Sequence, residues 1–303
     1  MIRVIITARG EPKSTEKAVN CILSQEIEGI KIIVCDPFIE VKNFIKEKFG
    51  EDKRVEFFLD PDEGKSNALN MLLEMYYNES KNDILVFTDG DVFIGEKSLK
   101  ELLNMFNDPK IGLVCGHPIS MNSRSNMFGF WSHMFFDEMN KTRLELFKKE
   151  KLFATSGYLF AIRNGIIKNF PISTNEDKII PSLFWNKDYK IGYCEKAKVY
   201  VLNPQNMKDF LQQKKRNIKG KIALKNQIKG FQTKETNFIN EIIRGIKVFF
   251  TYPNNFKETF WIITAMYARL RAWIGAFYEV KFKKQVFKDG WREEEIESTK
   301  PLD

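Results

Sequence analysis

Asp89 and Asp91, two carboxylates separated only by Gly90, are the residues whose types and spacing point most directly to chemistry. Two hard oxygen ligands of this kind suit Mg²⁺ or Mn²⁺, which bind carboxylates and commonly substrate phosphates as well. Gly90 allows a ligand or the backbone to approach closely. Asp-Gly is also a frequent tight-turn sequence, so the motif taken alone favours a plain turn. The rest of the chain favours the metal-binding interpretation instead.

Predicted strands and helices alternate around the motif and would position it. Residues 84–87 form a short apolar run just before Asp89, which predicts a buried strand. Strand and helix patterns alternate four times in about ninety residues, which indicates a mostly parallel sheet with helices on both faces. The predicted strands are 2–7, 31–35, 55–59 and 84–87, and the predicted helices are 14–24, 41–49 and 66–77.

Charged residues follow these strands in the chain. Because the carboxyl ends of parallel strands meet at one edge of a sheet, we expect these residues to line a single rim, as a site for phosphate and metal requires. The chain contains neither G-x-G-x-x-G nor G-x-x-x-x-G-K-[ST], so the dinucleotide and P-loop fingerprints do not apply. The residues of this rim are Glu11, Asp36, Lys65, Asp89 and Asp91.

The middle of the chain continues the α/β pattern. Segment 118–150 is crowded with Met and Phe, and it fits either a core helix with a lid or a wall that faces an acceptor or a membrane. Residues 152–163 are strand-like with a bend at 156–157. Further helices are predicted at 98–106 and 178–186, and further strands at 111–116, 189–193 and 198–202.

Charge and cysteine content narrow the classes of partner and compartment. The 303 residues carry a net charge of +8, which favours anionic partners such as nucleotide phosphates or acidic lipid. Six Lys or Arg lie within residues 214–225, the most basic stretch. Four scattered cysteines and only two histidines argue against a zinc site and fit free thiols in a reducing compartment. No secretory leader is evident, so we expect a cytoplasmic protein.

The C-terminal quarter departs from the α/β pattern. Residues 238–252 and 256–280 mix aromatic and aliphatic residues with Lys and Arg, and their longest uncharged run has ten residues, 259–268. This is well short of the ~20 apolar residues that span a bilayer. We expect amphipathic helices that lie on a membrane surface or pack on the domain. The predicted divisions are a domain at 1–230, the helical region at 231–291, and a charged, frayed tail at 292–303.

Six ordered motifs make the chain resemble the family 2 glycosyltransferases, which have the GT-A nucleotide-sugar fold. The resemblance covers about residues 1–220 and includes the DxD at 88–91. Each motif is weak alone, but six in order are specific. The matching segments are 4–11, 64–70 (GKSNALN, like GKxxALN), 88–91, 156–157 with 161–164, 175–177 (NED, like TED) and 213–217 (QKKRN, like QxxRW).

The resemblance implies a role for each matching residue. Asp91, with Asp89, would hold Mg²⁺ or Mn²⁺ against the donor diphosphate. Asp177 would be the general base that takes a proton from the acceptor hydroxyl, and Arg216 would stabilise the leaving diphosphate. The implied donor-binding and nucleotide-binding residues are Thr7, Arg9, Glu11, Asp36, Lys65, Asp89 and Gln213.

The implied function is an inverting, metal-dependent transfer of a sugar from a UDP-linked or GDP-linked donor to a glycan or lipid-linked acceptor. We expect it at the inner face of the cell membrane, with peripheral membrane contact. Asn217 replaces the Trp of QxxRW, which predicts a limited number of transfers rather than long polymers. Two other hypotheses remain: a nucleotidyltransferase, and a non-catalytic nucleotide-binding or lipid-binding module that uses the basic stretch. Nucleic acid is a less fitting partner because it leaves the acidic rim unexplained.

Overall fold

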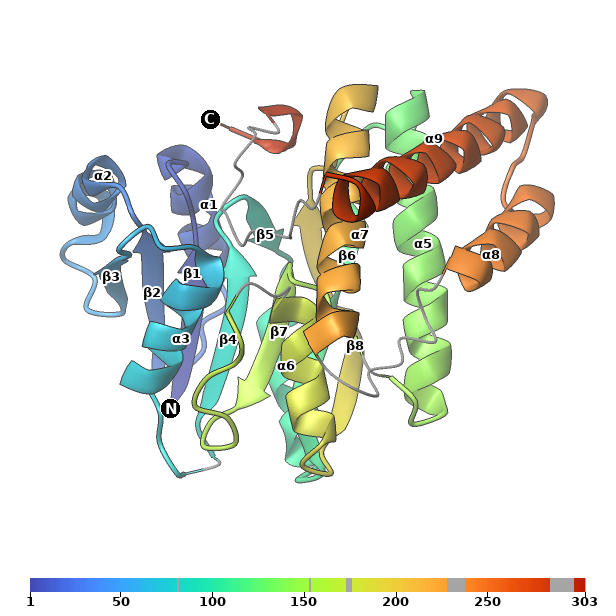
Figure 1. The fold of residues 1–303 in the computed structure, drawn as a ribbon. Coiled ribbons are helices and arrows are strands. Elements are labelled where there is room, and N and C mark those ends of the chain that lie inside the picture. Colours follow the sequence, from blue (N-terminus) through green and yellow to red (C-terminus); the bar gives the residue numbers. More distant parts are fainter. Residues whose placement is uncertain (81, 153, 173–175, 228–237, 284–296, 303) are drawn as a thin grey trace.

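An eight-stranded sheet forms the centre of the protein in the computed structural model (Figure 1). The structure describes residues 1–302 except 81, 153, 173–175, 228–237 and 284–296. The strands are β1 (Ile2–Thr7), β2 (Ile30–Asp36), β3 (Val55–Leu59), β4 (Ile84–Asp89), β5 (Val92–Ile94), β6 (Ile111–Ser120), β7 (Leu159–Arg163) and β8 (Lys190–Val201).

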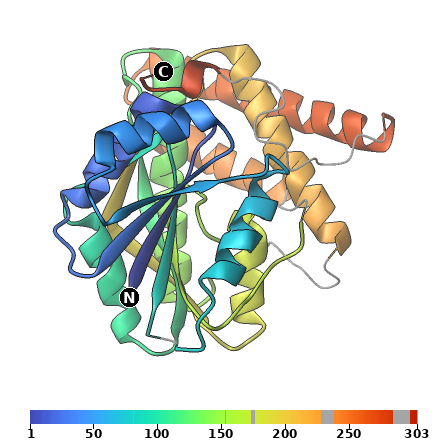
Figure 2. The same cartoon turned by 90° about the vertical axis from the view of Figure 1, so that its left-hand side faces the viewer.

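Helices cover both faces of this sheet. In Figure 2, α1 and α2 lie on one side of the first strands and α3 lies on the other. Two short 3₁₀ helices follow at Met105–Asn107 and Glu297–Thr299. The α-helices are α1 (Pro12–Leu23), α2 (Ile39–Phe49), α3 (Lys65–Met75), α4 (Ser98–Asn104), α5 (Met127–Lys148), α6 (Glu176–Trp185), α7 (Met207–Gln227), α8 (Phe238–Thr251) and α9 (Phe256–Lys281).

The continuous apolar runs of the first strands contribute side chains to two separate hydrophobic cores, one on each face of the sheet. Successive side chains of a strand point to opposite faces, so Val4 and Ile6 of β1 pack towards α1 and α2. Ile5 packs on the other face with Leu69 and Leu72 of α3. Strands buried on both faces read as unbroken apolar sequence, which is why they were recognisable without structure. The predicted α/β fold with helices on both faces is therefore confirmed.

The sheet order is β3-β2-β1-β4-β7-β6-β8-β5. β1, β2, β3 and β4 are parallel, and Thr7 at the end of β1 pairs with Asp89 at the end of β4. β7 is antiparallel to both of its neighbours, β4 and β6. β4 therefore lies at the middle of the sheet, with its carboxyl end beside the loops that follow β1 and precede β7.

Two strand boundaries differ from those expected. β8 is one strand where two, 189–193 and 198–202, were predicted, because its charged residues Glu195, Lys196 and Lys198 are exposed while the strand continues beside β6 and β5. Of the strand-like run 152–163, only 159–163 is a strand. Thr155 and Tyr158, which precede this strand, are bonded instead to Arg143 of α5, to Asp177 of α6 and to the Thr88 side chain.

The Met-rich and Phe-rich segment 118–150 forms mainly α5. Phe130, Trp131 and Met134 are buried against α8 and α9, and Trp131 Nε1 donates to the carbonyl of Trp261 at 2.6 Å. Of the two hypotheses for that segment, this contact favours the core helix. No α-helix in the described part of the chain is long and apolar enough to cross a bilayer.

The end of the chain is attached where fraying was expected. Ser298 donates from its hydroxyl and its backbone N–H to Asp209 Oδ2 near the start of α7, and Gln205 Nε2 donates to the Ser298 carbonyl at 3.1 Å. Residues 292–296 and 303 of the predicted tail, and 231–237 and 284–291 of the predicted helical region, lie outside the described residues.

Gly90, between the two aspartates, is tightly enclosed. A Cβ at this position would lie 2.7 Å from Ala8 Cβ and 2.8 Å from Thr15 Oγ1. Its N–H donates to the carbonyl of Thr7 at 2.8 Å, so it cannot shift without moving β1. The chain therefore requires glycine here for close approach of the loop to α1.

We expect Gly90→Ala to lower the free energy of unfolding by about 1–3 kcal/mol, because an added methyl overpacks the end of β1. The measurement is denaturant unfolding of both proteins. Gly245→Ala is the matched control, since its Cβ would meet only Met266 at ordinary contact distances of 3.6 and 3.9 Å. That variant should gain up to about 1 kcal/mol from helix propensity. An equally stable Gly90→Ala protein would contradict the close packing.

Candidate active site

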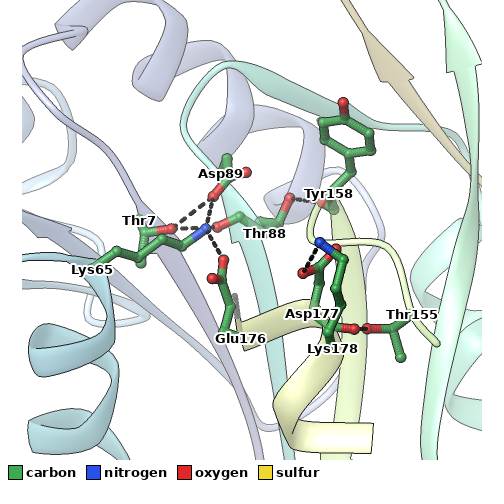
Figure 3. A network of polar contacts seen from close by, with 9 residues as sticks. All are labelled: Thr7, Lys65, Thr88, Asp89, Thr155, Tyr158, Glu176, Asp177 and Lys178. Atoms are coloured by element: carbon green, nitrogen blue, oxygen red, sulfur yellow. Dashed lines mark hydrogen bonds and ion pairs between the residues drawn. The ribbon is translucent and has the colours of Figure 1, made fainter. Parts of the chain in front are cut away.

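Lys65 joins the ends of four elements at the rim of the sheet (Figure 3). Its Nζ lies 2.6 Å from Asp89 Oδ1 at the end of β4 and 2.8 Å from Glu176 Oε1 at the start of α6. Thr7, the last residue of β1, donates its hydroxyl to the same Asp89 oxygen at 2.9 Å. Gly64 has φ +99°, which lets the chain turn sharply before α3 and present Lys65 at this point.

The three charges of this group stabilise one another. Burial by itself lowers the pKa of Lys65, but the carboxylates of Asp89 and Glu176 outweigh it and raise that pKa. For Glu176, burial raises the pKa, and Lys65 reverses the effect so that the pKa is lowered. Lys65 and Glu176 are therefore both charged at neutral pH. One ammonium neutralises part of two carboxylates that would otherwise repel each other.

Asp177 follows Glu176 directly, and its backbone is fixed by Thr155. The carbonyl of Asp177 accepts from Thr155 N at 3.2 Å and from Thr155 Oγ1 at 2.8 Å. The Thr155 carbonyl in turn accepts from Arg143 Nη2 of α5 at 2.7 Å. Lys178 Nζ is 3.9 Å from Asp177 Oδ1. Burial raises the pKa of Asp177, Lys178 opposes this, and Glu176 adds to it, with a net increase.

Tyr158 shows that the DxD pair and Asp177 share one region. Burial raises the pKa of its phenol, and the charges of Asp91, Asp89 and Asp177 raise it further. The carbonyl of Tyr158 accepts from Thr88 Oγ1 at 2.8 Å, which fixes this residue beside the end of β4. The three carboxylates expected to hold the metal and accept the proton are therefore close enough to Tyr158 for their charges to act on its phenol.

The donor set fits a divalent ion that is completed by substrate phosphate. Asp89 Oδ1 is engaged by Lys65 and Thr7, so a ligand would meet Asp89 through its second oxygen. No group of three or more His, Cys, Asp or Glu side chains in the described ranges could hold a metal unaided. Mg²⁺ and Mn²⁺ commonly take one or two carboxylates plus phosphate oxygens, so two aspartates suffice for such a site.

The rim beyond β1 carries the residues expected at the nucleoside. Asp36 is fully buried, and its two carboxylate oxygens accept from Gly10 N and Phe38 N, each at 2.8 Å. Burial raises the pKa of Asp36 to about 6, although these two bonds oppose the increase. Arg9 forms an ion pair with Asp62 and lies over the Phe38 ring.

Glu11 and Asp60 complete this part of the rim. Glu11 is buried at the residue before α1. Asp60, which the sequence left without a role, is 3% exposed, and its Oδ1 accepts from Asp62 N at 2.8 Å. Its Oδ2 has no hydrogen-bond partner within the described residues. Burial raises the pKa of Asp60 as well.

α7 delivers the last two predicted residues. Arg216 is exposed, and its positive charge contributes to lowering the pKa of Glu176 at the start of α6. Gln213 is half-buried, and its Oε1 has no hydrogen-bond partner in the part of the chain that the structure describes. Asn175 of the predicted NED motif lies outside the described residues.

Sequence reasoning gave no role to Glu176 or Tyr158. Glu176 could have been found from its place in the NED motif, next to the predicted base. Tyr158 had only the preceding Ser156-Gly157 bend as a signal. Their contacts depend on the packing of α6 on β6 and β8 and of β7 on β4, which no local pattern specifies.

We expect Lys65→Met to lower the free energy of unfolding by about 3 kcal/mol, because it leaves two largely buried carboxylates facing each other. Denaturant unfolding of the two single variants and the double variant Lys65→Met/Glu176→Gln gives the coupling energy. The double variant should recover much of the loss. Purely additive effects would show that the two side chains do not interact.

Three comparisons place the chain among known proteins. The model of the family described as "Glycosyltransferase like family 2" matches residues 2–220. A search of curated proteins finds no match. The solved mannosyltransferase PcManGT from Pyrobaculum calidifontis, in complex with GDP-Man and Mn²⁺, is similar with a TM-score of 0.60 and 16% identity, over 92% of this chain and 74% of that chain.

GalNAc-T7, solved with UDP, GalNAc and Mn²⁺, is similar with a TM-score of 0.50 and 14% identity, over 67% of this chain and 44% of that chain. At these identities the structural likeness establishes the GT-A fold, while the family match rests on most of the sequence. The chain belongs to glycosyltransferase-like family 2 and is a glycosyltransferase with the GT-A fold.

Proposed function

We propose that this enzyme transfers a sugar from a nucleotide-diphosphate donor to an acceptor hydroxyl with inversion at the anomeric carbon. The acceptor is a glycan or a lipid-linked saccharide at the inner face of the cell membrane. The observation that carries the proposal is that the charges of Asp89, Asp91 and Asp177 all act on the phenol of Tyr158, whose backbone is fixed beside the carboxyl end of β4. This gives a metal-binding pair and a separate proton acceptor in one site.

Each charged group of the site has a step that it fits. Asp177 takes the proton from the acceptor hydroxyl, and its raised pKa makes it a stronger base than a solvated aspartate. Arg216 offsets the negative charge that develops on the diphosphate as it leaves. A divalent ion on Asp91 would supply further stabilisation of that charge. Lys65 holds Asp89 and Glu176 in place, so that Asp89 can bind the sugar or ribose through its second oxygen.

The solved relatives support the donor class and the metal. PcManGT was solved with GDP-Man and Mn²⁺, and GalNAc-T7 with UDP and Mn²⁺. The acidic rim at β4 meets the same requirement here, because carboxylates repel a diphosphate unless a cation lies between them. On the nucleoside side, Asp60 Oδ2 has no hydrogen-bond partner among the described residues and is the acceptor for a base N–H group, which both uracil and guanine possess. Asp36 fixes the backbone of Gly10 and Phe38 beside it.

We expect Asp177→Asn to lower the rate of transfer by roughly 100- to 10,000-fold, because the amide cannot accept the acceptor proton. Donor binding, measured as the nucleotide-dependent shift in melting temperature, should be unchanged. Asp188→Asn, at an exposed turn with φ +62°, is the control for the same chemical change. Wild-type turnover in Asp177→Asn would reject the role of the base.

The raised pKa of Asp177 also predicts a pH dependence of catalysis. The base must be deprotonated, so kcat/KM falls as pH drops through the pKa of Asp177, which lies above that of an ordinary aspartate. The measurement is kcat/KM against pH in the wild type. An acid limb at or below the ordinary aspartate value would contradict the burial of this group.

We expect nucleoside diphosphates to raise the melting temperature only when Mn²⁺ or Mg²⁺ is present. The melting temperature is measured with UDP, GDP or CMP, each without the ion, with the ion, and with the ion plus EDTA. The comparison identifies both the preferred base and the metal requirement. Asp91→Asn should abolish the metal-dependent part of the shift. A full shift in EDTA would show that the diphosphate is held by protein cations instead.

A further inference from the structure

α8 and α9 lie on the side of the molecule away from β3 (Figure 1), and both carry exposed apolar side chains. We define the surface of these side chains as the α8–α9 face. On α9 it is a stripe in which exposed side chains recur every three or four residues, so that they share one side of the helix. This stripe consists of Phe260, Ile263, Tyr267, Leu270, Ile274 and Phe277. Ile243 and Phe250 of α8 are exposed as well, with Phe250 at 76%.

The α8–α9 face is separate from the surface by which α9 packs on the domain. Ala265 and Ala268 of α9 are buried in a cluster with Phe130 and Trp131 of α5. Ala272 and Ala276 are buried against Ile218 of α7. α9 is thus apolar on two sides, and folding buries only one of them. Such an extended apolar patch indicates a contact with something other than water.

A shallow groove lies on this face near the end of α9. Its volume is about 390 Å³, and apart from Lys281 its lining is apolar or aromatic, with Leu270, Ile274, Phe277, Tyr278 and Phe282 among the residues. Aromatic side chains prefer the boundary between water and lipid, where an apolar ring and a polar edge are both accommodated. The groove accepts hydrocarbon and offers little to a polar ligand.

The charges beside the face are positive. Lys247, Lys257, Arg271 and Lys281 are exposed and form no salt bridge with another described residue. The three carboxylates of α8 and α9 are held internally. Glu241 is bonded to Arg269 and Trp273, Glu258 to the backbone N–H of Asn254, and Glu279 to Lys215 and Lys219.

We propose that the α8–α9 face docks on the surface of an anionic lipid bilayer, with its apolar stripe in the headgroup region and its lysines and arginines against acidic headgroups. This membrane-docking proposal rests on the proposed function, because it says where the enzyme meets its acceptor. α9 packs on α7, through Glu279 with Lys215 and Lys219, and α7 carries Arg216. Docking therefore holds the helix that contributes to the catalytic site next to the membrane.

A second copy of the chain fits this face less well. A two-fold interface brings the same patch against itself, so Lys257 and Arg271 would approach like charges with no free carboxylate of α8 or α9 to pair with them. An anionic membrane supplies the missing negative charge. This face also carries aromatic side chains that are bulky for a close helix–helix interface, namely Phe260, Tyr267, Phe277 and Tyr278.

The test is co-sedimentation of the full-length protein with vesicles of phosphatidylcholine alone and of phosphatidylcholine mixed with phosphatidylglycerol. We expect binding to the mixed vesicles and little to the neutral ones. Ile274→Glu should lower the bound fraction at least tenfold, whereas Ile39→Glu, a similarly exposed apolar position on α2, should not. Lys257→Glu/Arg271→Glu should also lose binding, and Lys100→Glu on α4 is its control.

Each variant is first checked for the wild-type melting temperature and nucleotide-dependent shift, so a folding or donor-site defect is recognised separately. Phe250→Glu on α8 replaces Ile274→Glu if the latter unfolds. Equal binding by Ile274→Glu, or no binding of the wild type to anionic vesicles, overturns the proposal. A wild-type dimer that Ile274→Glu dissociates, without vesicle binding, would assign the face to contact between copies instead. Neither result would alter the nucleotide shift on which the proposed function depends.

Discussion

The ion pairs of Lys65 with Asp89 and Glu176 are the interaction on which the site depends. These three residues come from α3, β4 and α6, and Thr7 adds β1 through the same Asp89 oxygen. The carboxylates of Asp89 and Glu176 repel each other, so they stay close together only because the Lys65 ammonium lies between them. Once Glu176 is fixed, the next residue, Asp177, is fixed as well. The position of the proposed base is therefore set by a contact that takes no part in proton transfer.

The sheet provides the frame for this contact. The parallel strands β1, β2 and β3 bring the proposed nucleoside-binding loops to one edge, while antiparallel β7 enters beside β4 from the opposite direction. As a result Tyr158, just before β7, meets the end of β4, and Thr88 holds its carbonyl there. A fully parallel sheet would place that segment at the other edge. The one reversal in strand direction next to β4 thus brings the two halves of the site together.

The sequence allowed the rim of charged residues to be predicted because unbroken apolar runs such as 84–87 mark strands buried on both faces. It did not allow the partners of Lys65 to be predicted, since Glu176 lies far along the chain and its approach depends on tertiary packing. β8 was divided in two because Glu195, Lys196 and Lys198 interrupt its apolar pattern, yet these side chains are exposed while the backbone remains paired. The Asp60 oxygen that has no partner among the described residues is likewise not predictable from the sequence.

In the proposed reaction, a metal-bound diphosphate and a proton acceptor lie on two sides of one sugar. The most direct measurement is anomalous diffraction from crystals grown with Mn²⁺ and whichever of UDP or GDP binds. We predict one Mn²⁺ peak that touches the diphosphate and Asp91, with the Asp177 carboxylate lining the same cavity across the space for the sugar. A peak remote from Asp91, or an Asp177 carboxylate that faces a different surface, would contradict the central claim.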